Sequence, residues 1–344
     1  MAFAPQPAAA PKRARRWTRW LKRIAVGLVV LLIAFVFGFA PWWLGTLVTK
    51  RRFVYNDREN GGLTPASFSL PFDDAKFNGP DGTPLEGWWV PVADAKGTVV
   101  LAHGLNRSRI EMVKKLPFLQ AQGWNALLFD MRNHGTSGGT ARTFGWLEKG
   151  DLHAATAWVR AKSAGPVVLW GVSAGGAAST LAAAEDASVA GLVCDSSYRS
   201  LRDTVRHHIG LAREWRAWMR IVPSWPVTSE VLFWIGRAGH FDPELVDVEA
   251  AAGRLRGRPA LFVCNSGDRR MPQQIAFDLS KAAGDHAHVL VVPGNSHGGA
   301  WRDGTAAYES AVKVVLQEAA ESTRTASGGQ SEPRVASTPE RSQP

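Results

Sequence analysis

Cysteine and tyrosine are scarce in this chain, which has 2 cysteines and 3 tyrosines among 344 residues. Cys194 and Cys264 each end a short apolar run, so we interpret both as small buried hydrophobic residues. This usage excludes a disulfide framework. The sequence also lacks zinc-ligand spacing, a phosphate-binding glycine loop and internal repeats. We therefore expect no metal and no cofactor.

Acidic residues are absent from the first 52 positions, which carry ten lysine or arginine side chains. These ten account for the whole formal net charge of +10, because the remaining chain holds 30 basic and 30 acidic residues. The folded body is thus neutral, and we expect no nucleic-acid partner. Basic residues that flank an apolar segment instead indicate a membrane.

An uncharged segment extends from Ile24 to Thr49, and its first part, Ile24–Ala40, is almost wholly apolar. This run is long enough to cross the hydrocarbon core of a bilayer, which takes about 20 residues. Tryptophans suited to the two membrane interfaces lie on either side of it: Trp17, Trp20, Trp42 and Trp43. We predict a basic cytoplasmic segment over residues 1–23 and a transmembrane helix over 24–47.

The basic residues also predict the orientation of this helix. Seven of them precede the apolar run and three follow it, so the positive-inside rule places the N-terminus in the cytoplasm. The body would then be the extracytoplasmic part of a single-pass protein of the cell membrane. A cleaved signal peptide is the alternative, since Gly38-Phe39-Ala40 offers the small residues of a cleavage site. Pro41 would directly follow the cut and disfavours cleavage, so we favour an uncleaved anchor.

A strand that turns sharply into a helix is predicted around Ser173. The apolar, β-branched run from Val167 leads directly into Gly171-Val172-Ser173-Ala174-Gly175, and an alanine-rich segment follows. In the pattern Gly-x-Ser-x-Gly, the strained turn exposes the serine hydroxyl above the sheet, and the glycines let the two backbones pass closely. Ser173 is therefore a candidate nucleophile.

Strand-like and helix-like segments alternate through the body, which we assign to residues 53–320. Further strands are predicted at Leu85–Pro91, Gly97–Ala102, Asn125–Phe129, Val189–Cys194, Pro259–Cys264 and His288–Val292, and helices at Ile110–Gln122, Glu148–Lys162, Pro272–Ala283 and Ala300–Ala320. This order predicts an α/β fold, with a mostly parallel sheet covered by helices on both faces. Residues 321–344 are polar and predicted to be a disordered tail.

The alternation stops over residues 198–240, which are rich in tryptophan and arginine and contain Pro223 and Pro226. We predict a helical cap insertion here. Its pattern leaves three roles open: a packed cover over the sheet, a lid that contacts substrate, or a surface that reaches lipid.

Two polar groups follow the last two predicted strands, Asp268 after Pro259–Cys264 and His297 after His288–Val292. The carboxyl ends of parallel strands share one edge of the sheet, where ligands bind. A serine nucleophile needs a base and a group that orients the base. We predict Ser173 as nucleophile, His297 as base and Asp268 as acid.

Four other polar residues were considered for the catalytic roles. Asp195 directly follows Val189–Cys194 and stays a second candidate for the acid. Three further histidines are expected to be ordinary polar surface residues: His134, His207 and His208.

From about Leu85 to Leu316 the chain resembles the α/β-hydrolase superfamily, in particular bacterial serine hydrolases related to lysophospholipases and serine aminopeptidases. The stretches that carry the resemblance are His103-Gly104, Asp130-Met131-Arg132-Asn133-His134-Gly135-Thr136-Ser137, and Asp268 with Pro272. Asn133 departs from the family pattern, in which a glycine is usual. The resemblance implies an oxyanion hole formed by the backbone amides of Leu105 and Ala174. The supporting residues would be His103, Gly104, Gly171 and Gly175.

These residues together predict a serine hydrolase that cleaves an ester, thioester or amide through an acyl-enzyme, with a small-molecule or lipid-like acyl substrate. An esterase or lysophospholipase is the favoured interpretation. A serine peptidase or aminopeptidase of the same fold is one alternative, and a non-catalytic binding protein is another. The loss of a triad member would favour the binding protein, and none is lost.

Overall fold

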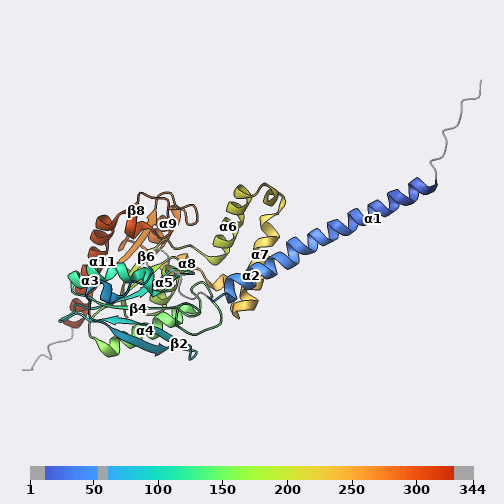
Figure 1. Cartoon of the computed structure of the whole chain (residues 1–344). Coiled ribbons are helices and arrows are strands. Elements are labelled where there is room, and N and C mark those ends of the chain that lie inside the picture. The colour runs from blue at the N-terminus through green and yellow to red at the C-terminus, as the bar shows by residue number, and fades with distance from the viewer. Residues whose placement is uncertain (1–11, 53–60, 329–344) are drawn as a thin grey trace, which may run out of the picture.

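The computed structural model describes residues 12–52 and 61–328 and contains one eight-stranded sheet (Figure 1). The strand order is β1-β2-β4-β3-β5-β6-β7-β8. The strands are β1 (Asp73–Asn78), β2 (Pro84–Val90), β3 (Thr98–Ala102), β4 (Asn125–Phe129), β5 (Val167–Val172), β6 (Val189–Asp195), β7 (Ala260–Asn265) and β8 (Ala287–Val292). Strands β3 to β8 pair in parallel, whereas β1 pairs antiparallel with β2, and β2 with β4. The predicted mostly parallel sheet is confirmed.

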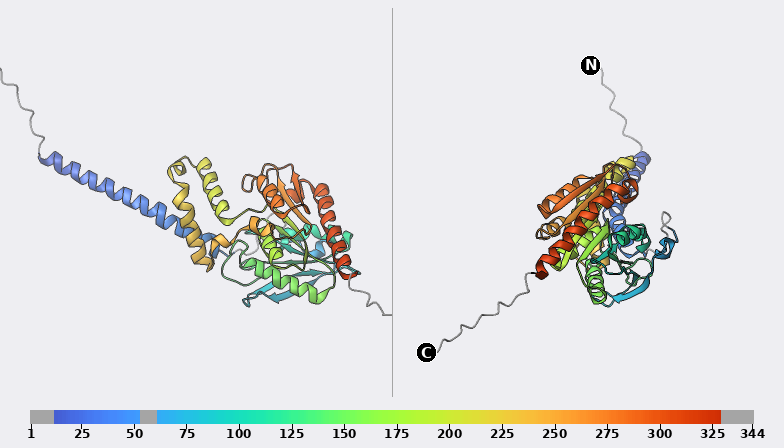
Figure 2. Two further views of the ribbon diagram at one scale, coloured as in Figure 1. Left: turned by 180° about the vertical axis from the view of Figure 1, so that it is seen from behind. Right: turned by 90° about the vertical axis from the view of Figure 1, so that its left-hand side faces the viewer.

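Helices cover both faces of this sheet and enclose two hydrophobic clusters (Figure 2). One cluster contains side chains of α4 (Glu148–Lys162), α5 (Ala174–Glu185), α8 (Val248–Ala252) and α9 (Gln274–Ala283). The other contains side chains of α3 (Leu116–Gln122) and α11 (Thr305–Gly328). The central strands β3, β4, β5 and β7 are buried along their whole length, because both of their faces are covered.

Several boundaries differ from the predicted ones. The edge strand β1 was missed because only two of its side chains, Ala75 and Phe77, are apolar and only Ala75 is buried, so the alternation is too short to indicate a strand. The helix predicted over Ile110–Gln122 begins as a 3₁₀ helix, Arg109–Lys115, and becomes α-helical only at α3. Gly304 separates α10 (Ala300–Asp303) from α11.

The predicted tail is helical at its start. Helix α11 continues to Gly328, past the boundary predicted at residue 320. Its last buried residues are Ala319 and Ala320, and the polar residues that follow them are still helical. The rest of the predicted tail, residues 329–344, lies outside the described residues.

A long helix leads into the body from the N-terminal side. It consists of α1 (Lys12–Ala34), a π-helical turn (Phe35–Phe39) and α2 (Ala40–Lys50). Its part from Arg16 to Lys50 is long and apolar enough to cross a membrane, judged by length and composition. Figures 1 and 2 show α1 extending away from the sheet and its covering helices.

The cap is a helical hairpin that stands beside this N-terminal helix (Figure 1). It comprises α6 (Leu201–Trp215), a 3₁₀ turn (Ala217–Ile221) and α7 (Ser224–Gly239), within the range 198–240 predicted for it. Helix α7 packs against α2 and contacts the π-helical turn.

Small side chains on one stripe of α2 allow this packing. Pro41, Gly45 and Thr49, four residues apart, are the buried positions of the helix. A Cβ atom at Gly45 would lie 2.8 Å from the Cβ of Trp234 and 3.0 Å from the carbonyl oxygen of Val231. The two backbones therefore approach as closely as a glycine permits.

The end of the N-terminal helix is also bonded to the body. The amide of Arg142 donates to the carbonyl of Thr49 at 2.9 Å, and the Arg52 guanidinium donates to the carbonyl of Ser137 at 2.7 Å. Helix α2 is thus held by both the cap and the loops above the sheet.

Gly45→Leu should destabilise this packing. Leucine is a better helix former than glycine, so any loss of folding stability must come from overpacking against α7. We expect this overpacking to cost about 1–3 kcal/mol. Thermal unfolding of the detergent-solubilised full chain measures the change. Gly38→Leu is the matched control, because nothing lies within 4 Å of a Cβ at Gly38. Equal melting temperatures for both variants would contradict a close contact between α2 and α7.

Candidate active site

Ser173 occupies a strained turn between β5 and α5. Its backbone angles, φ 53° and ψ −115°, lie in a region that L-residues rarely adopt. Two glycines make room for the turn. A Cβ at Gly171 would overlap the carbonyl of Gly175, and a Cβ at Gly175 would overlap the carbonyls of Ala102 and His103. The serine hydroxyl is therefore lifted above the ends of β3 and β5.

Loops after β7 and β8 bring Asp268 and His297 to this hydroxyl. His297 Nε2 lies 2.9 Å from Ser173 Oγ, and His297 Nδ1 lies 2.7 Å from Asp268 Oδ2. Both distances are those of good hydrogen bonds. The structure therefore brings together the three side chains that the sequence singled out, in a chain of hydrogen bonds that can pass a proton from the serine to the imidazole.

The environment of Asp268 keeps its carboxylate charged. Burial raises the pKa of Asp268, but the hydrogen bond and charge of His297, together with the backbone N–H groups of Met271 and Arg270, outweigh burial and hold the pKa below its usual value. Those amides donate to Oδ1 at 3.1 and 2.8 Å and leave Oδ2 to His297. A charged carboxylate at this position fixes the orientation of the imidazole.

Asp195, the second candidate for the acid, is directed to other partners. Its Oδ1 accepts from Ser196 Oγ at 2.8 Å, and its Oδ2 accepts from Tyr308 on α11 at 3.0 Å. Complete burial raises the pKa of Asp195, although these hydrogen bonds and the charge of Lys115 act the other way. This carboxylate holds together the strand end beneath the serine.

Ser196 links Asp195 to the histidine loop, a contact that the sequence did not reveal. Its hydroxyl donates to Asp195 and accepts from the amide of Gly298, the residue after His297, at 3.2 Å. Ser196 has a positive φ of 51°, and in this conformation its side chain lies between Asp195 and Gly298. No local signal marks this role, because the partner loop lies about a hundred residues away in the sequence.

The loop that carries Leu105 lies beside the serine. A Cβ at Gly104 would lie 3.6 Å from the Cβ of Ser173, and the amide of Gly104 donates to Glu111 Oε2 at 2.6 Å. Ala174 is the first residue of α5, where a backbone amide has no acceptor within the helix. Leu105 follows Gly104 in this loop, so its amide and that of Ala174 stay the predicted candidates for an oxyanion hole.

His103 supports this loop from inside the core, where it is fully buried. The amide of Met131 donates to its Nε2 at 3.0 Å, so the ring proton resides on Nδ1, which donates to the carbonyl of Gly104 at 2.8 Å. The neutral ring joins the ends of β3 and β4.

The expectation that His134 is a surface residue is wrong, since only 1% of it is exposed. Burial holds the pKa of His134 well below its usual value, so the ring is neutral. Its Nδ1 donates to the carbonyl of Arg132, and its Nε2 accepts from the amide of Asn106 beside Leu105. The preceding Asn133 adopts a φ of 59°, a conformation that asparagine tolerates better than most residues, which explains how it replaces the usual glycine. His207 and His208 are partly exposed on α6.

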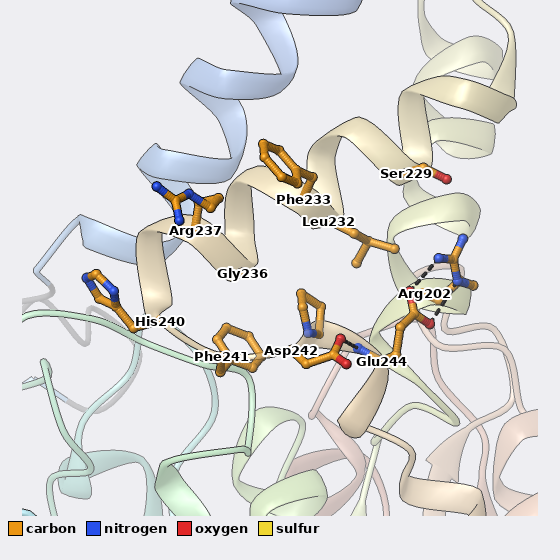
Figure 3. Close-up of a pocket in the computed structure, with 11 residues that line it drawn as sticks. Arg202, Ser229, Leu232, Phe233, Gly236, Arg237, His240, Phe241, Asp242 and Glu244 are labelled. Atoms are coloured by element: carbon orange, nitrogen blue, oxygen red, sulfur yellow. Dashed lines mark hydrogen bonds and ion pairs between the residues drawn. The ribbon is translucent and has the colours of Figure 1, made fainter.

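Two hollows adjoin the cap. One of about 550 Å³ lies under α7, where Arg202 and Glu244 form an ion pair across it, and no triad residue lines it (Figure 3). The other, of about 240 Å³, is lined by Tyr198, Thr204 and the residues Arg270 and Met271 that follow Asp268. In the described part of the chain, no group of three or more histidine, cysteine or acidic side chains could hold a metal ion.

Comparison with known proteins gives a family model and several relatives. The model described as serine aminopeptidase, S33, matches residues 93–244, which include Ser173 but not Asp268 or His297. The uncharacterized protein YqkD of Bacillus subtilis is 23% identical over 246 residues, which cover 70% of this chain and 78% of that protein.

Solved structures extend the likeness to about three quarters of the chain. The Pyrococcus furiosus esterase Pf2001 superposes with a TM-score of 0.62 at 21% identity, covering 77% of this chain and 98% of that one. The α/β hydrolase GrgF from Penicillium gives a TM-score of 0.55 at 19% identity, covering 73% of this chain and 99% of that one. With the observed sheet and the turn at Ser173, these likenesses show that the chain has the α/β-hydrolase fold, as predicted.

Substitution of the two candidate acids should separate their roles. Asp268→Asn should lower kcat on an activated ester at least a hundredfold more than Asp195→Asn, or about 3 kcal/mol of barrier, because asparagine cannot balance the charge on the imidazole. Steady-state kinetics measures kcat, and thermal unfolding measures folding. Asp195→Asn should act mainly on thermal unfolding. If Asp195→Asn is inactive and Asp268→Asn keeps nearly the wild-type kcat, the two roles are reversed.

Proposed function

We propose that this α/β-hydrolase-fold chain is a membrane-anchored serine hydrolase that cleaves a carboxylic ester through an acyl-enzyme. The observation that carries the proposal is the relay from Ser173 Oγ through His297 to Asp268, with distances of 2.9 and 2.7 Å. A serine alone is a poor nucleophile, and such a relay is what activates it.

In the proposed mechanism Ser173 Oγ attacks the ester carbonyl carbon while its proton moves to His297 Nε2. The amides of Leu105 and Ala174 stabilise the negative oxygen of the tetrahedral intermediate. The ester C–O bond then breaks, and the alcohol leaves with the proton from His297. Water, deprotonated by the same histidine, attacks the acyl carbon, the bond from Ser173 Oγ to that carbon breaks, and the proton returns from His297 to Ser173 Oγ as the acid leaves. Asp268 stays ionised throughout and stabilises the imidazolium.

One observation supports an ester as the substrate: the structural neighbour from Pyrococcus furiosus is an esterase. The match to a serine aminopeptidase model favours a second candidate, the amide bond of a peptide. Hydrolysis of nitrophenyl esters of increasing acyl length, beside aminoacyl nitroanilides, decides between the two.

Replacement of the nucleophile should abolish turnover. Ser173→Ala leaves His297 and Asp268 without an attacking group, and we expect kcat to fall by about ten-thousandfold or more while the protein stays folded. Ester hydrolysis and labelling by a fluorophosphonate probe measure the effect. Ser179→Ala, which removes a buried hydroxyl on the same helix, is the control and should keep both signals. Fluorophosphonate labelling of Ser173→Ala at the wild-type rate would refute the assignment.

We propose further that α1 and α2 anchor the chain, with the N-terminus cytoplasmic and the body outside. The charge asymmetry around residues 24–47 and the apolar helix from Arg16 to Lys50 support this orientation.

A reporter fused after Pro344 should reveal this orientation. Alkaline phosphatase, which is active only outside the cytoplasm, should be active, and green fluorescent protein exported by the same route should be dark. The opposite pattern would reverse the topology. A mature protein that begins at Pro41 or later would show a cleaved signal in place of an anchor.

A further inference from the structure

The free end of the cap hairpin exposes four large apolar side chains. Trp215, Trp218, Ile221 and Trp225, here named the cap tip, are 65%, 62%, 78% and 78% exposed. They come from the end of α6, the 3₁₀ turn and the start of α7, so they form one continuous stretch of chain. A cluster of this kind is costly in water and marks an interaction site.

Charged groups around the cap tip suit a lipid interface. Arg216 and Arg220 are exposed, and among the described residues neither side chain has a carboxylate partner. The acidic residue nearest in sequence, Glu214, is paired with Arg269, next to Asp268. Tryptophans interleaved with unpaired arginines are the combination found at headgroup level, where indoles lie at the interface and guanidinium groups bind phosphates.

The packing of α7 on α2 determines the height of the cap tip along the N-terminal helix. Gly45 lies against Val231 and Trp234, and both helices end close to the body. The backbone of α7 is non-helical at Trp225, so the unbroken helix starts at Pro226, about eight residues before Trp234. At a rise of about 1.5 Å per residue, this start lies up to about 12 Å further from the body than the contact with Gly45. Helix α7 also contacts the turn Phe35–Phe39.

Phe35–Phe39 lies within the apolar run that we propose to span the membrane. Figures 1 and 2 show the hairpin end on the side of the body from which α1 extends. A bilayer positioned around this run therefore also meets the cap tip.

We propose that the cap tip inserts into the extracytoplasmic leaflet of the same bilayer that the N-terminal helix spans. The proposal rests on the proposed membrane anchoring and goes beyond it, since an anchor alone would leave the cap in water. Trp215, Trp218, Ile221 and Trp225 enter the leaflet just below its headgroups, and the long side chains of Arg216 and Arg220 extend back to lipid phosphates. The ion pair between Glu214 and Arg269 then connects the lipid-bound cap to the loop of Asp268.

Depth-dependent quenching tests this insertion in the full chain. A cysteine introduced as Trp218→Cys carries an NBD fluorophore, and the native Cys194 and Cys264 are buried and should not react. The protein is reconstituted into vesicles of phosphatidylcholine and phosphatidylglycerol that contain nitroxide lipids. We expect at least twofold stronger quenching than at Val314→Cys, an exposed control on α11, with a shallow nitroxide more effective than a deep one. Ile221→Cys is the second reporter should the first variant misfold, with fluorophosphonate labelling as the folding check.

A third label, Leu31→Cys in the apolar run, separates this proposal from the anchoring on which it rests. If Leu31→Cys is quenched by deep nitroxides while both cap labels behave like Val314→Cys, the anchor stands and cap insertion is refuted. If Leu31→Cys is not quenched, anchoring fails, and cap insertion fails with it. Cap labels that are shielded from aqueous iodide but not quenched by nitroxide lipids would show a protein partner, such as a second copy, and would also overturn the proposal.

Discussion

The close passage of α5 across the ends of β3 and β5 is the constraint on which the site depends. At Gly171 and Gly175 the backbones approach so closely that a side chain at either position would overlap a carbonyl group. This approach forces Ser173 into its strained conformation and places its hydroxyl at the edge where the loops after β7 and β8 also end. The hydrogen bonds to His297 and Asp268 then follow from the parallel order of the strands.

A buried polar network supports this edge from below. Asp195, Ser196 and Tyr308 connect the end of β6 to the histidine loop and to the C-terminal helix, and Trp170 Nε1 donates to the Tyr308 hydroxyl at 3.1 Å. Burial lowers the pKa of Lys115 and raises that of Asp195, and each charge partly offsets the burial of the other. Because every polar atom in such a network needs a partner, we expect small changes in it to lower the stability of this edge of the sheet.

Sequence reasoning reached the features whose signals are local. Ser173 lies in a glycine motif after an apolar strand, and Asp268 and His297 each follow a strand, so their common edge could be inferred. The edge strand β1 could not be inferred, because it is rich in charge and its alternation consists of only two apolar residues, Ala75 and Phe77. His134 was misassigned because its burial depends on packing between the loops after β3 and β4. The docking of α2 on α7 left only a faint trace, the small residues Pro41, Gly45 and Thr49 at helical spacing.

The docked N-terminal helix does not behave as a flexible linker. A flexible linker lets a domain sample many heights and orientations, and it contributes only an effective concentration that depends on its length. Here Gly45 packs into α7, and Thr49 and Arg52 are bonded to the loops above the sheet, so the helix and body share one orientation. If the helix spans a bilayer, the distance from the membrane plane to Ser173 becomes a fixed dimension of the protein. This distance would then contribute to substrate selectivity. A substrate whose scissile bond lies at a different height above the membrane would not meet Ser173, even if the bond were chemically suitable.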